Sequence, residues 1–214
     1  MTNDDICPPN VGGYPSDCEV TQGLLKRALE RETPRERGYA WRACLAKAEP
    51  IRLLLLDVDG VLTDGTITYT HEGTEIKSFH TRDGFGLRLL QEAGVEVGLI
   101  TARSSAAVRR RAEDLKLTHV YQGCRNKIEA YRELLDKLDL QEKEIAYMGD
   151  DWLDLPLLTR VGLSVSVADG AHEVRQVVDY VTSRPGGRGA VRELCDLIIA
   201  AKGKQEELLA RYMG

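Results

Sequence analysis

Long hydrophobic runs are missing from this sequence. Its longest uninterrupted apolar stretches hold only a few residues, whereas a membrane-spanning helix needs about 20. The opening segment, MTNDDICPPN, is acidic and polar, so we expect neither a membrane span nor a signal peptide. We therefore expect a protein that acts in the cytoplasm and has no membrane partner.

An excess of positive charge is also missing. The chain of 214 residues carries a formal net charge of -5 at pH 7. This balance provides no overall basic field for nucleic acid, so we expect no nucleic-acid partner. An anionic ligand has to be bound by a local cluster of residues instead.

Cysteine is scarce, and its number is odd. The five residues Cys7, Cys18, Cys44, Cys124 and Cys195 are scattered along the chain and are not typical of a disulfide framework. A metal site on Cys7 and Cys18 is an alternative, but it has neither CxxC spacing nor a nearby histidine.

Short apolar runs alternate with amphipathic stretches from Ile51 onward. Continuous apolar strands separated by helices predict a parallel sheet covered on both faces, which is a doubly wound α/β fold. The predicted strands lie near residues 51–57, 95–101, 118–122, 144–150, 163–168 and 179–182. The predicted helices lie near residues 84–93, 104–115, 126–138, 151–159, 171–176 and 189–201.

One segment interrupts this alternation just after the first strand. Residues 63–80 alternate polar and apolar side chains around Glu72 and Gly73, which predicts an inserted β-hairpin. An isolated hairpin is only marginally stable in water, so we expect this one to pack against something, such as another subunit.

The first 50 residues form an extension whose role the sequence does not reveal. We expect a loop over residues 1–20, a helix from Thr21 that Pro34 stops, and a second helical stretch from Glu36 to Ala48. The main domain is predicted over residues 51–203, with a C-terminal tail over residues 184–214.

Polar side chains follow four successive predicted strands. Because the carboxyl ends of parallel strands meet at one edge of a sheet, we expect these side chains to gather there. They are Asp57 and Asp59 after the first strand, Thr101 after the second, Lys127 after the third, and Asp150, Asp151 and Asp154 after the fourth.

This set suits phosphoryl transfer. Asp57 can attack phosphorus if Mg²⁺, held by Asp57 and Asp150 with Asp59 as a further ligand, offsets the repulsion between the two anions. Thr101 and Lys127 can stabilise the transferring group by hydrogen bond and charge. Asp59 can protonate the leaving oxygen and later activate water.

The order of these residues resembles the haloacid dehalogenase superfamily of Mg²⁺-dependent phosphatases. The resemblance rests on DVDGV at 57–61, Thr101, Lys127 and GDDWLD at 149–154. Further stretches, DVDGVLTDG, RDGFG, LITAR, YMGDDWLDLP and GGRGAVRELCDLI, are similar to the family of 3-deoxy-D-manno-octulosonate 8-phosphate phosphatases over about residues 51–203.

This resemblance implies Mg²⁺-dependent hydrolysis of that sugar phosphate through an aspartyl-phosphate, as a step in lipopolysaccharide precursor synthesis. It also implies a homotetramer without a cap domain. The sequence agrees on the cap, because residues 58–100 have room only for the hairpin and one helix.

Particular residues follow from the same resemblance. It implies substrate contacts at Asp59, His80, Thr81, Arg82, Asp83, Gly84, Arg88, Arg103, Arg111 and Lys127. It implies that a neighbouring subunit's tail closes the site with Gly186, Gly187, Arg188, Gly189 and Arg192. Asp151 and Asp154 are expected to support the site from behind these groups.

Other interpretations compete with this one. A calcium-binding EF-hand needs Gly and Glu where the chain has Leu62 and Thr68. A receiver domain would place its acidic residues on different strands. Asp150 and Asp151 alone could be a helix N-cap pair. Within the resemblance, a nonulosonate 9-phosphate phosphatase and a catalytically inactive binding or assembly domain remain alternatives.

Overall fold

A computed structural model describes residues 17–30 and 38–213 of the chain. Its centre is a six-stranded sheet in the order β5-β4-β1-β6-β7-β8, in which every neighbouring pair is parallel. The strands are β1 (Leu53–Leu56), β4 (Glu96–Ile100), β5 (His119–Tyr121), β6 (Ile145–Gly149), β7 (Leu163–Ser166) and β8 (Tyr180–Val181). The predicted parallel sheet is confirmed.

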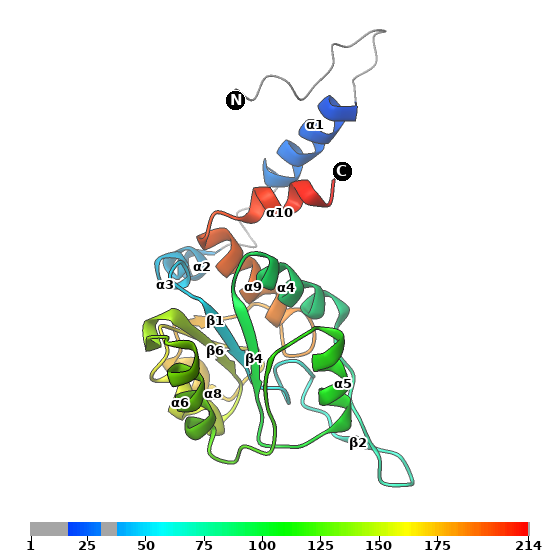
Figure 1. Cartoon of the computed structure of the whole chain (residues 1–214), viewed down its shortest axis with the longest axis vertical. Helices are drawn as coiled ribbons and strands as arrows, with labels where there is room; N and C mark the ends of the chain where they lie inside the picture. Colours follow the sequence, from blue (N-terminus) through cyan, green and yellow to red (C-terminus); the bar gives the residue numbers. More distant parts are fainter. Residues whose placement is uncertain (1–16, 31–37, 214) are drawn as a thin grey trace.

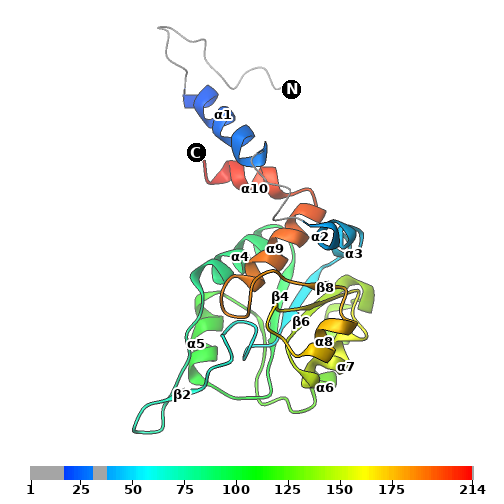
Figure 2. The same cartoon turned by 180° about the vertical axis from the view of Figure 1, so that it is seen from behind.

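Helices cover both faces of this sheet (Figures 1 and 2). One face carries α4 (Thr81–Glu92), α5 (Ala106–Asp114) and α9 (Ala190–Ala201). The other carries α6 (Lys127–Leu138), α7 (Leu155–Leu158) and α8 (His172–Val177). Short 3-10 turns, η2 (Glu142–Glu144) and η3 (Trp152–Asp154), flank β6. The doubly wound architecture is therefore as predicted.

The four leucines of β1 explain why the central strand is apolar throughout. Leu54 and Leu56 belong to the core beneath α4 and α9, whereas Leu53 and Leu55 belong to the core beneath α6 and α7. Successive side chains of a strand point to opposite faces, so a strand buried on both faces needs an apolar residue at every position.

The predicted hairpin is present and projects from the domain (Figure 1). Its strands β2 (Thr68–Tyr69) and β3 (Glu75–Ile76) pair antiparallel, with Tyr69 opposite Glu75. Each strand has only two residues, which is little backbone pairing to hold a hairpin in place. Between β1 and β4 the chain adds only this hairpin and α4, so this stretch contains no cap domain.

The N-terminal region differs from prediction in its helix boundaries. α1 (Asp17–Glu30) begins within the expected loop, and the predicted stop at Pro34 lies outside the described residues. The second helical stretch is split at Cys44 into α2 (Tyr39–Ala43) and α3 (Leu45–Ala48). Trp41 and Ala48 are buried in the same core as α9, so α2 and α3 are part of the packed domain.

At the other end of the chain, α10 (Gln205–Arg211) lies beside α1, away from the sheet (Figure 2). The ring of Tyr212 packs edge-on against Phe85 of α4, with 5.4 Å between ring centroids. Within the described parts of the chain, no helix combines the length and apolar character that crossing a bilayer requires.

The cysteines bring one correction. Cys44, Cys124 and Cys195 are free thiols, as expected for scattered cysteines. Cys18, however, is disulfide-bonded, which the sequence pattern did not predict and which leaves no thiolate there for a metal. Cys7, the other half of the alternative metal site, lies outside the described residues.

Candidate active site

Asp57 and Asp150 lie at the point where the order of the sheet reverses. Asp57 follows β1 and Asp150 follows the adjacent β6, with β4 on the other side of β1. Ligands of open α/β sheets bind at such reversals, beyond the carboxyl ends of the strands. One oxygen from each of Asp57, Asp150 and Asp154 lies within 4.8 Å of the others, so the strand ends bring three carboxylates together.

Asp154 is the most deeply held of the three. Its Oδ1 accepts hydrogen bonds from Lys127 Nζ at 2.6 Å and from the Tyr147 hydroxyl at 2.5 Å. Its Oδ2 accepts the backbone N–H groups of Asp150 at 2.9 Å and Asp151 at 3.2 Å. Because both oxygens are already used, Asp154 serves to position its neighbours, and Asp57 and Asp150 carry the oxygens open to a cation.

Lys127 lies between Asp57, which follows β1, and Asp154, which belongs to η3 after β6. Its side chain is 3% exposed, and Nζ is 2.9 Å from Asp57 Oδ1. Burial disfavours the ammonium, but the carboxylates of Asp57 and Asp154 outweigh burial and raise the pKa of Lys127. Lys127 is therefore a fixed positive charge beside the candidate nucleophile.

Burial and repulsion between neighbouring carboxylates raise the pKa values of Asp57 and Asp150. Burial raises the pKa of Asp57 to about 6, although Lys127 beside it acts in the opposite direction. Burial, followed by the charges of Asp57 and Asp154, raises the pKa of Asp150 to about 7. A divalent cation would relieve this repulsion, and oxygen ligands of this kind suit Mg²⁺.

Gly60 shows how closely the loop after β1 passes the cluster. A Cβ at this position would lie 2.1 Å from Asp150 Oδ2, and the residue adopts a φ of +87°. Only glycine meets both conditions without displacing Asp150.

Thr101 is the buried residue that follows β4, on the other side of β1 from Asp150. Its hydroxyl oxygen accepts the backbone N–H of Arg103 at 3.3 Å. Asp151, by contrast, is exposed and caps η3 by accepting the Trp152 N–H at 2.7 Å. The N-cap interpretation thus fits Asp151, while Asp150 belongs to the carboxylate cluster.

Asp59 lies outside this cluster of three carboxylates. Its Oδ1 accepts a hydrogen bond from Lys77 of the hairpin, and its Oδ2 is 3.7 Å from Arg103 Nε. Sequence reasoning missed Lys77 and Tyr147. A lysine within an alternating hairpin gives no sign that its side chain is buried, and a tyrosine within an apolar strand looks like an ordinary core residue.

The predicted substrate contacts lie in several different places. Arg103 faces Asp59, whereas Thr81 and Arg82 are exposed at the start of α4. Gly84 packs under Arg111, whose guanidinium also lies over the ring of Phe79. Arg88 lies close enough to the Tyr212 hydroxyl to oppose the rise in its pKa, which partial desolvation and the hydrogen bond to Glu92 cause. The chain alone thus gathers only part of the predicted set.

Asp83 needs a correction. Its side chain is 1% exposed, and its two oxygens accept the backbone N–H groups of Gly189 at 3.1 Å and Arg192 at 2.8 Å. These are free donors at the N-terminus of α9, which a carboxylate satisfies well. Asp83 therefore caps a helix, and its carboxylate is not accessible to a sugar phosphate.

The predicted tail needs a second correction. The backbone N–H of Gly187 donates to the Val61 carbonyl at 2.9 Å, and a Cβ on Gly186 would lie 1.7 Å from the Gly60 carbonyl oxygen. Arg188 faces Asp64 at 3.5 Å. Residues 186–188 are therefore packed against the loop after β1 of their own subunit, and Gly189 and Arg192 are bound to α4, so this stretch does not extend as a free tail.

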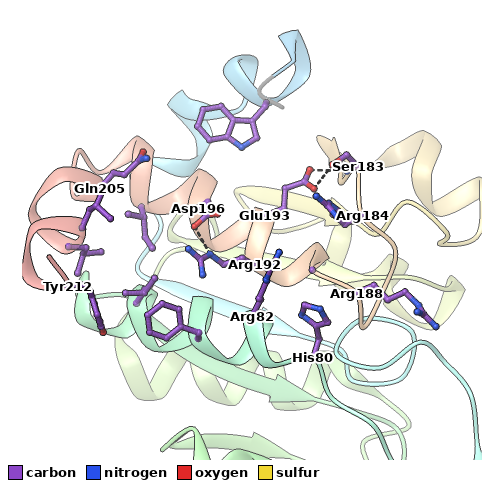
Figure 3. A pocket seen from close by; sticks show the side chains of 17 residues that line it. His80, Arg82, Ser183, Arg184, Arg188, Arg192, Glu193, Asp196, Gln205 and Tyr212 are labelled. Atoms are coloured by element: carbon purple, nitrogen blue, oxygen red, sulfur yellow. Dashed lines mark hydrogen bonds and ion pairs between the residues drawn. The ribbon is translucent and has the colours of Figure 1, made fainter. Parts of the chain in front are cut away.

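A cavity of about 790 Å³ lies between α4, α9 and α10 (Figure 3). His80 and Arg188 line one end, Arg82 and Arg192 line the middle, and Tyr212 lines the other end. None of the three clustered carboxylates borders it. The segment with Arg188 and the buried Gly186 separates this cavity from the loop after β1, so the cavity is distinct from the carboxylate cluster.

Fold and site together define a class of protein. A doubly wound sheet that places two carboxylates and a buried lysine at its reversal point has the parts of a metal-assisted phosphohydrolase. Residues 118–193 match the family model described as haloacid dehalogenase-like hydrolase.

Comparison with known proteins narrows this class. The chain is 50% identical over 163 residues to 3-deoxy-D-manno-octulosonate 8-phosphate phosphatase of Escherichia coli strain K12, covering 76% of this chain and 87% of the relative. The chain belongs to the 3-deoxy-D-manno-octulosonate 8-phosphate phosphatase family of haloacid dehalogenase-like hydrolases.

Solved structures of proteins from this family resemble the fold of this chain. A crystal structure of the Yersinia pestis 3-deoxy-D-manno-octulosonate 8-phosphate phosphatase matches with a TM-score of 0.75 and 47% identity, covering 76% of this chain and 88% of that one. The Moraxella catarrhalis phosphatase, solved with magnesium, phosphate and KDO, matches with a TM-score of 0.78 and 42% identity. That match covers 80% of this chain and 98% of the other.

Proposed function

We propose that this protein hydrolyses 3-deoxy-D-manno-octulosonate 8-phosphate to the free sugar acid and phosphate, using Mg²⁺. The observation that carries the proposal is the pair of open carboxylates, Asp57 and Asp150, beside the buried Lys127, 2.9 Å from Asp57. The 50% identity to the Escherichia coli enzyme supports the choice of substrate.

We propose the following chemistry for these groups. An Asp57 oxygen attacks phosphorus, the bond from phosphorus to the sugar oxygen breaks, and Asp59 gives its proton to that oxygen. Water then attacks phosphorus while its proton passes to Asp59, which frees Asp57 and phosphate. Lys127 and Thr101 stabilise charge on the phosphoryl oxygens. Mg²⁺ on Asp57 and Asp150, with Asp59 as a further proposed ligand, supplies positive charge that lets two anions approach.

Substrate recognition is assigned to cations near Asp59. We propose that Arg103, which faces Asp59, contributes positive charge that attracts the acidic sugar. The remaining proposed contacts are His80, Thr81, Arg82, Gly84, Arg88, Arg111 and Lys127.

Assembly and location extend the proposal. We propose a cytoplasmic homotetramer that works in lipopolysaccharide precursor synthesis. Ile67, Tyr69 and Ile76 of the hairpin are 46%, 57% and 48% exposed, which gives a second subunit an apolar surface to cover. Light scattering on the purified protein, with Ile67→Asp and Ile76→Asp variants beside it, measures the assembly.

A phosphate-release assay with and without Mg²⁺ tests the function. We expect release from the octulosonate 8-phosphate to exceed release from a nonulosonate 9-phosphate, and to disappear in Asp57→Asn. Preference for the nonulosonate would make the second phosphatase the better description. No release from either, or release unchanged in Asp57→Asn, would show that the domain is not this phosphatase.

A further inference from the structure

The hairpin directs two charged side chains, those of Lys77 and Glu75, inward beside the loop after β1. Lys77 follows β3, and its side chain is 1% exposed, while that of Glu75 is 14% exposed. A lysine is almost never buried to this degree unless it is paired. Lys77 therefore needs its carboxylate partners, and one of them is Asp59.

These partners form a closed ring of alternating charge. Lys77 Nζ donates to Asp59 Oδ1 and lies 3.2 Å from Glu75 Oε1. Arg103 donates to Glu75 Oε2, and its Nε is 3.7 Å from Asp59 Oδ2. Two cations thus hold two carboxylates, and each carboxylate contacts both cations.

The hydrogen bond from Arg103 lowers the pKa of Glu75 to about 2, so Glu75 remains a fixed negative charge. Lys77 is thereby anchored from its own hairpin and points its ammonium at Asp59. Arg103 connects the ring to a second site residue, because its backbone N–H donates to the Thr101 hydroxyl oxygen at 3.3 Å.

A ring that only fastened the hairpin would not require Asp59. The ion pair between Glu75 and Arg103 already connects the hairpin to the loop after β4. Arg103 also donates to the Tyr69 hydroxyl at 3.1 Å. Among the described residues, the one contact of Lys77 outside the hairpin is with Asp59, the residue that the proposed function uses for proton transfer.

We propose that Lys77 is a positioning residue for Asp59, and that the hairpin uses it to hold the proton-transferring carboxylate in its working orientation. This inference rests on the proposed function. Lys77 does not touch the substrate in this role. Lys77 affects the rate only in steps that require Asp59 to be aligned with an oxygen that takes up a proton.

Substrates with different leaving groups can distinguish a Lys77 that positions Asp59 from a Lys77 that only supports the fold. A sugar alkoxide is a poor leaving group and needs the proton from Asp59, whereas 4-nitrophenolate leaves without one. The ratio kcat/KM reports the steps up to the first irreversible one, so it covers departure of the leaving group and omits later hydrolysis of the aspartyl-phosphate. A defect in Asp59 alignment must therefore depend on the leaving group.

The experiment compares Lys77→Met, Lys77→Arg and wild type on the octulosonate 8-phosphate and on 4-nitrophenyl phosphate. We expect Lys77→Met to lower kcat/KM about 10- to 100-fold on the sugar phosphate and less than about threefold on the aryl phosphate. Lys77→Arg keeps the cation and is expected to recover most of the loss. Lys47→Met, a change on α3 that breaks the ion pair between Lys47 and Asp179, is the matched control and is expected to change neither value.

A crystal structure of Lys77→Met adds a readout that does not depend on turnover, since Asp59 is expected to rotate away from its wild-type position. Equal losses on both substrates, no loss on either, or an unmoved Asp59 would overturn the inference. If Lys77→Met does not fold, Glu75→Gln takes its place. We expect Glu75→Gln to lower kcat/KM several-fold on the sugar phosphate, with a smaller change on the aryl phosphate. Wild-type protein inactive on both substrates would overturn the proposed function itself.

Discussion

The hydroxyl of Tyr147 donates to Asp154 Oδ1 at 2.5 Å, in a fully buried position on β6. The same hydroxyl lies 3.1 Å from Lys127 Nζ, which in turn contacts Asp57. A side chain that belongs to the core by burial thus holds the charged groups of the candidate active site in place.

Removing this hydroxyl tests that arrangement. We expect Tyr147→Phe to lower the free energy of unfolding by about 1.5–3 kcal/mol, because Asp154 loses one donor in a buried site. Activity is expected to fall as Lys127 and Asp154 lose alignment. The matched control is Tyr131→Phe, since the Tyr131 hydroxyl is buried without a hydrogen-bond partner among the described residues. Chemical denaturation measures both, and equal losses would contradict the assignment.

Asp83 provides a second prediction, which separates a helix cap from a substrate contact. We expect Asp83→Ala to lower the free energy of unfolding by about 0.5–2 kcal/mol, because α9 loses two N-terminal hydrogen bonds. KM for the sugar phosphate should stay unchanged in the protein that folds. Asp114→Ala, which removes only the exposed pair with Arg110, is the control. A raised KM at unchanged stability would restore the predicted substrate role.

The raised pKa values of Asp57 and Asp150 predict how stability depends on pH. With values of about 6 and about 7, these groups bind more protons in the folded protein than in the unfolded chain between about pH 4 and pH 7. Stability of the metal-free protein therefore falls as pH rises through this window. Mg²⁺ competes with those protons, so its stabilising effect should grow over the same window.

Thermal unfolding in EDTA and in Mg²⁺, at about pH 5 and about pH 7.5, measures this difference. The increase in melting temperature caused by Mg²⁺ is expected to be larger at the higher pH. Asp150→Asn removes one of the two open carboxylates and should show a smaller dependence on pH. An effect of Mg²⁺ that is the same at both pH values would contradict the prediction.

Two glycines with similar backbone angles give a matched test of the loop after β1. Gly60 and Gly73 have φ values of +87° and +83°, but a Cβ at Gly73 would meet nothing within 4 Å. We expect Gly73→Ala to lose about 1 kcal/mol of stability from backbone strain alone. Gly60→Ala should also displace Asp150 and weaken Mg²⁺ binding. Titration calorimetry with Mg²⁺ checks this, and wild-type affinity in Gly60→Ala would refute it.

Much of the fold could be predicted from local pattern. The four leucines before Asp57 indicate a strand buried on both faces, and Gly73 after Glu72 indicates the hairpin turn. Such signals depend on neighbouring residues, and the structure places these elements close to the expected positions. The helix boundaries near Asp17 and Cys44 were less predictable, because packing against distant elements decides where those helices begin and break.

Local residue patterns were enough to predict which residues follow the strands, and so which charges meet at the sheet edge. Predicting Asp57, Lys127 and Asp150 needed only the rule that parallel strands end together. Tertiary structure alone decided the use of each charge. It turned Asp83 toward α9, enclosed Asp154 among four donors and brought Lys77 to Asp59. A carboxylate's role depends on the donors that surround it, and those donors come from segments far apart in the chain.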